Sequence, residues 1–296
     1  MLILVTGATG FIGRSLVPAL LGKGYKVRAL CRREEDSADL PKGAESYVGD
    51  VTRPATLSGA LRGVDVVIHL AGMVSYSRPK EELFRVNAIG TKNLIEQCGS
   101  VRKFILSSSV SVYGEIRGEA DESYPLAPRN SYGESKLSAE NFVRKSAVKS
   151  VILRIAPVYG EGGPSWRKNL SLLEKGFPIP STKNTTHVVH VSEVVQAFVR
   201  SVAKGEGVYN IAGREPVPFR EFAGRLMELL GRKPRFLPAF IVGAMARMGG
   251  MKTYLDVLTM NRNYDIGKAQ KELGYAPAAD FNRELAKMVT WYKKAA

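Results

Sequence analysis

Three glycines near the start of the chain constrain its fold more than any other feature. Residues 2–5 are wholly apolar and lead into Gly7, Gly10 and Gly13, after which residues 15–21 show the apolar spacing of a helix. Because glycine lacks a Cβ, backbone at such a turn can approach a pyrophosphate, and the helix that follows offers free N–H groups to the anion. The sequence therefore predicts a strand, a phosphate-binding turn and a helix.

Apolar runs and helical stretches then alternate through residue 160. The strand-like runs are 25–30, 64–70, 104–106 and 151–155, and the longest helical stretches between them are 81–98 and 133–145. This alternation predicts an α/β fold, a doubly wound parallel sheet of the Rossmann type, followed by a smaller, mostly helical C-terminal substrate domain. The expected boundaries are 1–165 for the dinucleotide-binding domain, with 181–212 returning to it, and 166–180 plus 213–296 for the substrate domain.

Composition narrows the class of protein. The chain has 296 residues, of which 45% are hydrophobic and 24% charged, as in ordinary globular proteins. Two cysteines, Cys31 and Cys98, cannot build a disulfide framework, and no secretory leader or membrane-spanning run is visible, so we expect a cytoplasmic protein without a membrane span. The net charge of +15 is spread along the chain without aromatic interleaving or a helix-turn-helix pattern, so no nucleic-acid partner is expected.

The second predicted strand ends without an acid. An acid at this place would bind the ribose 2′-hydroxyl of NAD, whereas arginine favours the 2′-phosphate of NADP. The strand is followed by Arg32 and Arg33, whose guanidinium groups suit a phosphate, so NADP is the preferred cofactor and NAD the alternative. In the competing interpretation, Arg32 and Arg33 belong to a solvated charged loop together with the acids at 34–36 and bind no phosphate. Asp50 ends a third strand-like run, where we expect adenine contacts.

A tyrosine and a lysine four residues apart form the candidate catalytic pair. On a helix, Tyr132 and Lys136 would share one face, one turn apart. A phenol is a poor base at neutral pH, but a nearby ammonium lowers its pKa and makes tyrosine a usable acid and base. Serines at 107–109 end an apolar strand, at the edge where open α/β sheets bind ligands. A hydroxyl there can hydrogen-bond a substrate carbonyl or alcohol.

Taken together, these residues resemble the extended short-chain dehydrogenase/reductases, also called the NAD-dependent epimerase/dehydratase family. The resemblance covers nearly the whole chain and is carried by segments 6–13, 49–51, 69–72, 87–91, 107–114, 153–160, 190–194 and 264–269 with Tyr132 and Lys136. It implies that Ser109, Tyr132 and Lys136 are catalytic, with Tyr132 moving the hydroxyl proton during hydride transfer. It also implies a homodimer and a cofactor site lined by Gly7, Thr9, Gly10, Phe11, Ile12, Gly13, Asp50, Val51, Leu70, Ala71, Gly72, Asn87, Ser107, Tyr132, Lys136 and Pro157.

Departures from the subgroups of this family bear on the substrate. Sugar dehydratases carry Thr-Asp-Glu where this chain has Ser109-Val110-Ser111, which disfavours dehydration. Nucleotide-sugar epimerases often carry Arg-Asp where this chain has Thr186 and His187. We therefore expect an NAD(P)-dependent oxidoreductase acting on a small-molecule secondary alcohol or ketone. A UDP-hexose 4-epimerase that retains NAD is the alternative, and a non-catalytic dinucleotide sensor is a weaker one.

Two further features have competing interpretations. The apolar, methionine-containing segment 236–251 resembles the branch with dihydroflavonol reductases and hydroxysteroid dehydrogenases. It would line a hydrophobic pocket, pack between domains or, with basic residues on both sides, touch a membrane surface. His187 and His190 lack a nearby third ligand, so no metal site is expected.

Overall fold

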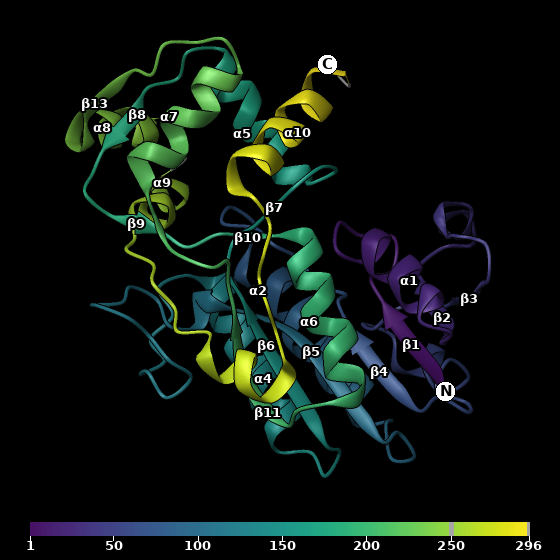
Figure 1. The fold of residues 1–296 in the computed structure, drawn as a ribbon. Helices are drawn as coiled ribbons and strands as arrows, with labels where there is room; N and C mark the ends of the chain where they lie inside the picture. Colours follow the sequence, from purple (N-terminus) through teal and green to yellow (C-terminus); the bar gives the residue numbers. More distant parts are fainter. Residues whose placement is uncertain (249–251, 295–296) are drawn as a thin grey trace.

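A seven-stranded parallel sheet forms the centre of the molecule (Figure 1). The structure, a computed structural model, describes residues 1–248 and 252–294, so residues 249–251 at the end of the apolar segment lie outside the described residues. The strands are β1 (Leu2–Thr6), β2 (Lys26–Cys31), β3 (Ala44–Val48), β4 (Val66–His69), β5 (Lys103–Ser109), β6 (Ser150–Ile155) and β11 (Gly207–Ile211), in the order β11-β6-β5-β4-β1-β2-β3. The expected doubly wound sheet is confirmed. The chain reverses direction of travel across the sheet between β1 and β4, and such a switch point opens a ligand crevice at the carboxyl ends of the strands.

Helices cover both faces of this sheet and build a second part beside it. Those of the sheet part are α1 (Gly13–Gly22), α2 (Lys80–Leu83), α3 (Gly90–Ile95), α4 (Ser131–Arg144) and α6 (Val191–Ala203). Alternate residues of β1 face opposite sides, so Ile3 packs in the core under α1 and α6, and Leu4 packs in the core under α3 and α4. Clusters of apolar side chains thus cover both faces of the sheet, which explains the continuous hydrophobic runs of the sequence.

The second part contains the remaining helices and several short strands. The helices are α5 (Pro164–Glu174), α7 (Phe219–Leu229), α8 (Ala239–Met248), α9 (Lys252–Thr259) and α10 (Phe281–Lys294). The short strands pair as β7 (Val158–Tyr159) with β10 (Val189–His190), β9 (Thr185–Thr186) with β12 (Val217–Pro218), and β8 (Ile179–Ser181) with β13 (Phe236–Pro238). A separate apolar core joins α5, α7 and α10, as expected for a smaller helical domain. Within the described residues, no helix has the length and apolar character to cross a bilayer.

The segment around residues 264–275 crosses back to the sheet part. Tyr264, Ala269, Leu273 and Tyr275 are buried in the core under α6, and Tyr264 forms a parallel bridge with Ala120. The sequence-based division assigned 213–296 entirely to the substrate domain. We propose instead that 264–275 is counted with the dinucleotide-binding domain, because its side chains fill that core.

The predicted helix over 81–98 is interrupted by a π-helical turn. The turn spans Phe84–Ile89 between α2 and α3. The Thr91 hydroxyl donates to the Asn87 carbonyl oxygen at 2.6 Å, so a side chain competes for the oxygen that a regular helix would use. Turns of this kind are frequent at functional sites, and Asn87 lies inside this one.

The glycine turn after β1 is closed from two sides. Gly7 has a positive φ of 69°, and a Cβ at this position would lie 2.8 Å from the Ala71 backbone nitrogen in the loop after β4. A Cβ on Gly13 would lie 2.3 Å from the Gly7 carbonyl oxygen. Neither contact can be relieved by moving a flexible side chain. The glycines therefore allow the first turn of α1, the β1 loop and the β4 loop to meet.

We predict that Gly13→Ala destabilises the protein by about 1–3 kcal/mol and abolishes tight dinucleotide binding, because backbone must move to admit the methyl group. Gly22→Ala, at the other end of α1, is the matched control, since nothing lies within 4 Å of its added Cβ. That variant should unfold at the same denaturant concentration as the parent or slightly higher. Urea unfolding checks both, and equal effects of the two substitutions would contradict the packing argument.

Candidate active site

The candidate cofactor residues lie along the carboxyl edge of the sheet. Gly7, Thr9, Gly10, Phe11, Ile12 and Gly13 follow β1, Arg32 and Arg33 follow β2, Asp50 and Val51 follow β3, Leu70, Ala71 and Gly72 follow β4, Ser107 is in β5, and Pro157 follows β6. The first turn of α1 contains no acid, and its N-terminus lies directly after the glycine turn. A turn that excludes Cβ atoms, followed by a helix N-terminus without acids, suits the pyrophosphate of a dinucleotide.

The N-terminus of α4 positions the catalytic pair. Asn130 caps the helix by accepting a hydrogen bond from the Gly133 nitrogen at 2.9 Å. A Cβ on Gly133 would lie 2.5 Å from the Ser111 carbonyl oxygen, so only glycine allows α4 to approach the serine loop this closely. The approach brings the phenol of Tyr132 into a hydrogen bond with the Ser109 side chain at the end of β5. The structure thus brings together two residues that the sequence only suggested as partners.

Burial determines how this pair is protonated. Desolvation raises the pKa of Tyr132 above its ordinary value, the neighbouring Tyr76 raises it further, and the hydrogen bond with Ser109 only partly opposes them. The sequence-based expectation that Lys136 lowers this pKa is wrong for the structure, because burial outweighs any effect of the ammonium. Lys136 is itself buried, and desolvation lowers its pKa to about 8 although the charge of Glu140 acts in the opposite direction. At neutral pH the tyrosine is therefore a neutral proton donor beside a protonated lysine.

A directional chain of hydrogen bonds supports the loop after β4. The Ala71 nitrogen donates to the Thr6 hydroxyl at 3.1 Å, and the Thr6 oxygen lies 2.7 Å from Nδ1 of His69. On the other side of the ring, Nε2 lies 3.0 Å from the Thr91 hydroxyl, which donates to the Asn87 carbonyl. Because Thr91 uses its proton on that carbonyl, the ring must donate from Nε2 and accept at Nδ1. His69 is neutral, and burial lowers its pKa to about 3.

The Asn87 side chain connects this series of hydrogen bonds to α4, the helix that carries the candidate catalytic pair. Its oxygen accepts from the Met73 nitrogen at 2.7 Å, and its amide donates to the Met73 carbonyl and to the Ser135 hydroxyl, both at 2.9 Å. Ser135 lies next to Lys136 in α4 and donates to the Tyr132 carbonyl at 2.7 Å. Three of the amide's hydrogen-bonding positions are thus occupied by protein. Asn87 therefore positions the loop and α4 relative to each other.

A buried ion pair lies behind the catalytic residues. Glu140, one turn beyond Lys136, accepts from the Arg154 guanidinium at 2.8 and 3.0 Å and from the Ser108 hydroxyl at 2.6 Å. The Arg154 and Glu140 side chains are 1% and 0% exposed. Burial opposes ionisation of Glu140, but hydrogen bonds from Arg154 and Ser108 outweigh it and lower the pKa of the carboxyl. The pair fixes α4 against β5 and β6.

The two arginines after β2 differ in their contacts. The Arg33 guanidinium binds the Asp36 carboxylate at 2.8 Å, so the charged-loop interpretation holds for this residue. Arg32 is exposed, forms no ion pair with any residue in the described ranges, and lies close enough to Asp50 to influence its charge. Burial opposes ionisation of Asp50, yet hydrogen bonds from Thr52 and the nearby arginines lower the pKa of the carboxyl. Arg32 is thus the cation available to a cofactor at this strand end.

Sequence reasoning missed one residue at the reaction centre. The ring of Tyr76, in the loop before α2, meets the Tyr132 ring edge-on with centroids 6.1 Å apart. Burial raises the pKa of Tyr76, while the charge of Arg262 and a hydrogen bond with Ser111 lower it. No motif marks this tyrosine, because it comes from an irregular loop. Its contacts place it beside Tyr132 and Ser111, two residues of the candidate site.

The two histidines of the second half have structural roles. His187 is buried; its Nε2 lies 2.9 Å from the Gly213 carbonyl oxygen, and its Nδ1 accepts from the Tyr264 nitrogen at 3.1 Å. His190 caps α6 through its side chain. Thr186 is buried as well. The positions where epimerases often carry Arg-Asp are thus buried, and both ring nitrogens of His187 are bonded to protein.

Comparisons with known proteins agree with this geometry. The model of the NAD dependent epimerase/dehydratase family matches residues 3–212. A sterol-4-alpha-carboxylate 3-dehydrogenase (decarboxylating) of Bos taurus is 32% identical over 245 residues, 75% of this chain and 68% of its own length. A 4-hydroxy-2-methyl-3-oxo-4-farnesyl-3,4-dihydroquinoline-1-oxide ketoreductase of Stigmatella aurantiaca is 28% identical over 92% of this chain and 91% of its own. Among solved structures, UDP-glucose 4-epimerase of Thermotoga maritima with UDP-glucose superposes with a TM-score of 0.82 at 25% identity, covering 100% and 99% of the two chains.

We predict that Glu140→Gln lowers the free energy of unfolding at neutral pH by about 3–5 kcal/mol, because it leaves the Arg154 charge buried without its partner. Since the folded state lowers the pKa of Glu140, its contribution is present above the unfolded pKa and is lost as pH falls toward the folded value. The variant should therefore lose less stability than the parent on acidification.

Glu82→Gln serves as the control, since Glu82 pairs with Arg78 at the surface and contributes about 0.5 kcal/mol or less. Denaturant unfolding at a series of pH values measures all three proteins. Parallel stability curves for the parent and Glu140→Gln would refute the assignment.

Proposed function

This chain belongs to the NAD-dependent epimerase/dehydratase family, and we propose that it is an NADP(H)-dependent oxidoreductase that transfers a hydride between nicotinamide and a secondary alcohol or ketone. The observation that carries the proposal is the buried Tyr132 phenol hydrogen-bonded to Ser109, with Lys136 one helical turn away. A sensor that only binds a dinucleotide would not need this pair. The similarity to a dehydrogenase and to a ketoreductase supports the same reaction class.

The protonation of the site favours ketone reduction. A neutral Tyr132 can donate its proton to the carbonyl oxygen of a ketone as the hydride arrives. The Ser109 hydroxyl holds the phenol and can bind the same oxygen. A bound nicotinamide would supply the hydride in this direction and would accept it in the reverse one. Protonated Lys136, held near Gly72, is placed to bind ribose hydroxyls of the cofactor.

The strand end after β2 supports NADP as the preferred cofactor. At this strand end, Arg32 is exposed and has no carboxylate partner among the residues described, and a 2′-phosphate would provide one. Gly7, Gly10 and Gly13 would hold the pyrophosphate, and Asp50 and Val51 would border the adenine. The remaining candidate cofactor residues, at the ends of β4, β5 and β6, would enclose the nicotinamide half.

A UDP-hexose 4-epimerase that retains NAD is the second candidate, because the similarity to an epimerase extends over the entire chain. Thr186 and His187 count against it, since neither carries the guanidinium that epimerases often place there for the diphosphate. Denaturing the purified protein and identifying any released dinucleotide separates the two. Stoichiometric NAD would favour the epimerase, and an empty protein that prefers NADPH to NADH would favour the oxidoreductase.

We also propose a homodimer in the cytoplasm. The dimer rests on the family resemblance. Cys31 and Cys98 are free and buried, and burial raises the pKa of both thiols. Two unreactive thiols without a disulfide suit a reducing compartment.

We predict that Tyr132→Phe lowers kcat for ketone reduction by about 100- to 10,000-fold, because the proton donor is removed while the ring and its packing remain. The affinity for NADPH should not change. Tyr25→Phe, after α1 at the opposite edge of the sheet, is the control and should retain full activity. Steady-state kinetics with a panel of ketones, with fluorescence titration of NADPH, provide the measurement. A Tyr132→Phe variant with unchanged turnover would disprove the catalytic assignment.

We predict that Arg32→Ala weakens NADPH binding by about 10- to 100-fold and leaves NADH binding unchanged, because only NADPH carries the phosphate that forms a charge-assisted hydrogen bond. The neighbouring Arg33→Ala is the matched control. It should have a smaller effect, since Asp36 already occupies that guanidinium. Titrations with both nucleotides test this, and a loss of NADH affinity equal to that of NADPH would exclude a 2′-phosphate role for Arg32.

A further inference from the structure

Helix α8 exposes an apolar stripe to solvent. Phe240, Ala244 and Met248 follow one another at intervals of one turn along one face, with Ile241 beside them. Phe240 is 78% exposed and Met248 85% exposed. Of the eight large hydrophobic side chains exposed in the described part of the chain, three lie on this one helix. Such clustering marks an interaction surface, whereas singly scattered apolar side chains need no explanation.

The opposite face of α8 already has its packing partners. Val242 and Ala246 are buried, and the helix packs against β8, β13 and α9. The exposed stripe is therefore not a misplaced core face, since the core of this part is closed without it. Figure 1 places α8 and β13 at the outer end of the second part, far from β2 and β3. Among the described residues nothing covers the stripe, so an external partner is needed to shield it from water.

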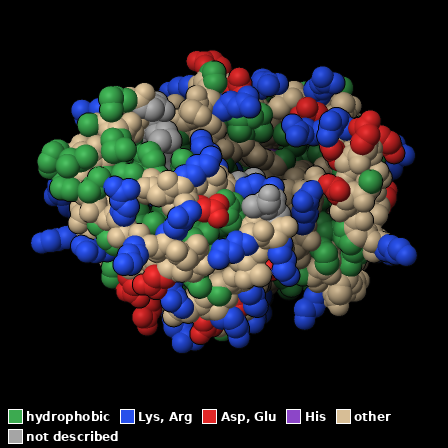
Figure 2. Space-filling view, turned by 90° about the horizontal axis from the view of Figure 1, so that it is seen from above, with side chains coloured by type: hydrophobic (Ala, Val, Ile, Leu, Met, Phe, Trp, Pro, Cys, Tyr) green, Lys and Arg blue, Asp and Glu red, His purple; other side chains and the backbone are tan. Residues whose placement is uncertain are grey.

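The charge around the stripe has one sign. The stretch 229–255 contains five Lys or Arg residues and no Asp or Glu. Arg232, Lys233, Arg235 and Arg247 are exposed, and none of them forms an ion pair with a residue in the described ranges. Figure 2 shows hydrophobic side chains gathered at the left of the face, over this part of the molecule, with Lys and Arg around them. An apolar helix face with basic neighbours is the pattern that binds anionic bilayers.

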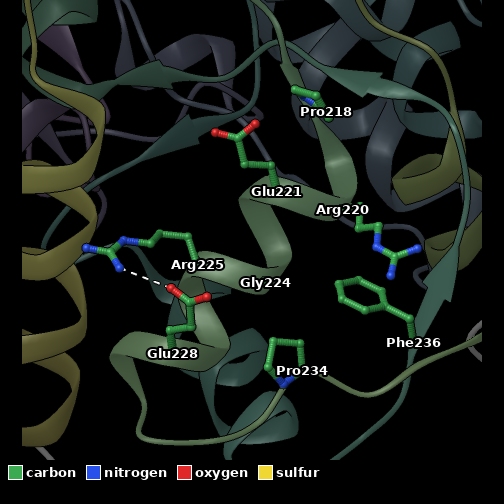
Figure 3. Close-up of a pocket in the computed structure, with 8 residues that line it drawn as sticks. All are labelled: Pro218, Arg220, Glu221, Gly224, Arg225, Glu228, Pro234 and Phe236. Atoms are coloured by element: carbon green, nitrogen blue, oxygen red, sulfur yellow. Dashed lines mark hydrogen bonds and ion pairs between the residues drawn. The ribbon is translucent and has the colours of Figure 1, made fainter.

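A groove beside β13 adds one more cation to the same side. It has a volume of about 450 Å³ and lies along the outer face of α7 (Figure 3). The Arg220 guanidinium lies over the Phe236 ring, 4.5 Å from its centroid, where β13 leads into α8. The groove also contains acids: Glu228 pairs with Arg225 at 3.1 Å, and Glu221 points away from Arg220 (Figure 3). Arg220 is thus available to a phosphate headgroup.

A second copy of this chain is a poorer occupant for two reasons. A ten-residue helix is about 15 Å long, so its face covers far less than the roughly 800 Å² per partner of a stable interface. A two-fold dimer through this stripe would also bring two surfaces of the same positive charge together. A negatively charged lipid surface has neither problem, because it is extended and of opposite charge.

We propose that α8 and its basic neighbours dock the protein on the surface of an anionic lipid bilayer, with Phe240, Ile241 and Met248 inserted among the headgroups. Helix α9, against which α8 packs, lines a groove shared with Arg129 and Asn130 at the start of α4. Docking would therefore bring the catalytic helix close to the membrane. This inference does not depend on which reaction the site performs, since it concerns a surface outside it.

The test is flotation of the full-length protein with vesicles, without substrate or dinucleotide. We expect binding to phosphatidylcholine vesicles that contain phosphatidylglycerol, and little binding to phosphatidylcholine alone. Phe240→Ser combined with Met248→Ser should weaken vesicle binding at least about tenfold, because the variant lacks two large apolar side chains that would be buried in the bilayer. Arg232→Gln combined with Lys233→Gln should weaken it about 10- to 30-fold.

Val48→Ser is the matched control, because Val48 is an exposed apolar residue on β3, at the other end of the molecule. It should bind vesicles like the parent, and thermal unfolding should show that all variants remain folded. Absence of parent binding to anionic vesicles would overturn the proposal. So would equal binding by the Phe240 and Met248 variant, or a loss of self-association in that variant without any vesicle binding by the parent.

Discussion

The hydrogen bonds that run from Thr6 through His69, Thr91 and Asn87 to Ser135 are the interaction on which the site depends. They cross from β1 to β4, through the π-helical turn, and into α4. In this series of hydrogen bonds each donor has one acceptor, so only one tautomer of the His69 imidazole satisfies all of them. Because these groups are buried, losing any member would leave another polar atom unpaired, at a cost of about 1–3 kcal/mol. The loop after β4 and the catalytic helix are therefore fixed together.

The Glu140–Arg154 pair complements that chain from behind. It joins α4 to β5 and β6 in the absence of solvent, and it also affects the electrostatics of the reaction centre. The Glu140 charge partly offsets the cost of burying the Lys136 ammonium, so the lysine stays charged at neutral pH although its pKa is lowered to about 8. Tyr132 has no such partner and remains a neutral phenol. The same burial that makes the site rigid thus keeps the Tyr132 phenol in its protonated form.

The two halves of the molecule use their charge differently. In the sheet part, Asp36 pairs with Arg33, and Arg32 stays exposed beside Asp50 without an ion pair among the described residues. In the second part, the stretch 229–255 has no acid, and its cations surround an exposed apolar helix face. The first arrangement is suited to one small anion held precisely, and the second to an extended anionic surface. The net charge of +15 thus includes one exposed cation after β2 and a basic group around α8.

The sequence by itself determined the class of fold and the inventory of the site. Apolar runs alternating with helices predicted the parallel sheet, the glycine spacing predicted the turn before α1, and the Tyr132 and Lys136 spacing predicted a shared helix face. These signals are local, since each depends on residues within one or two turns of each other. Tertiary structure decided what depends on contacts between distant segments: the return of 264–275 to the sheet core, the ring of Tyr76 beside Tyr132, and the hydrogen bonds of Asn87 to Met73 and Ser135. It also reversed the expected pKa shift of Tyr132, because the degree of burial around a phenol is set by everything that packs over it and not by its neighbours in sequence.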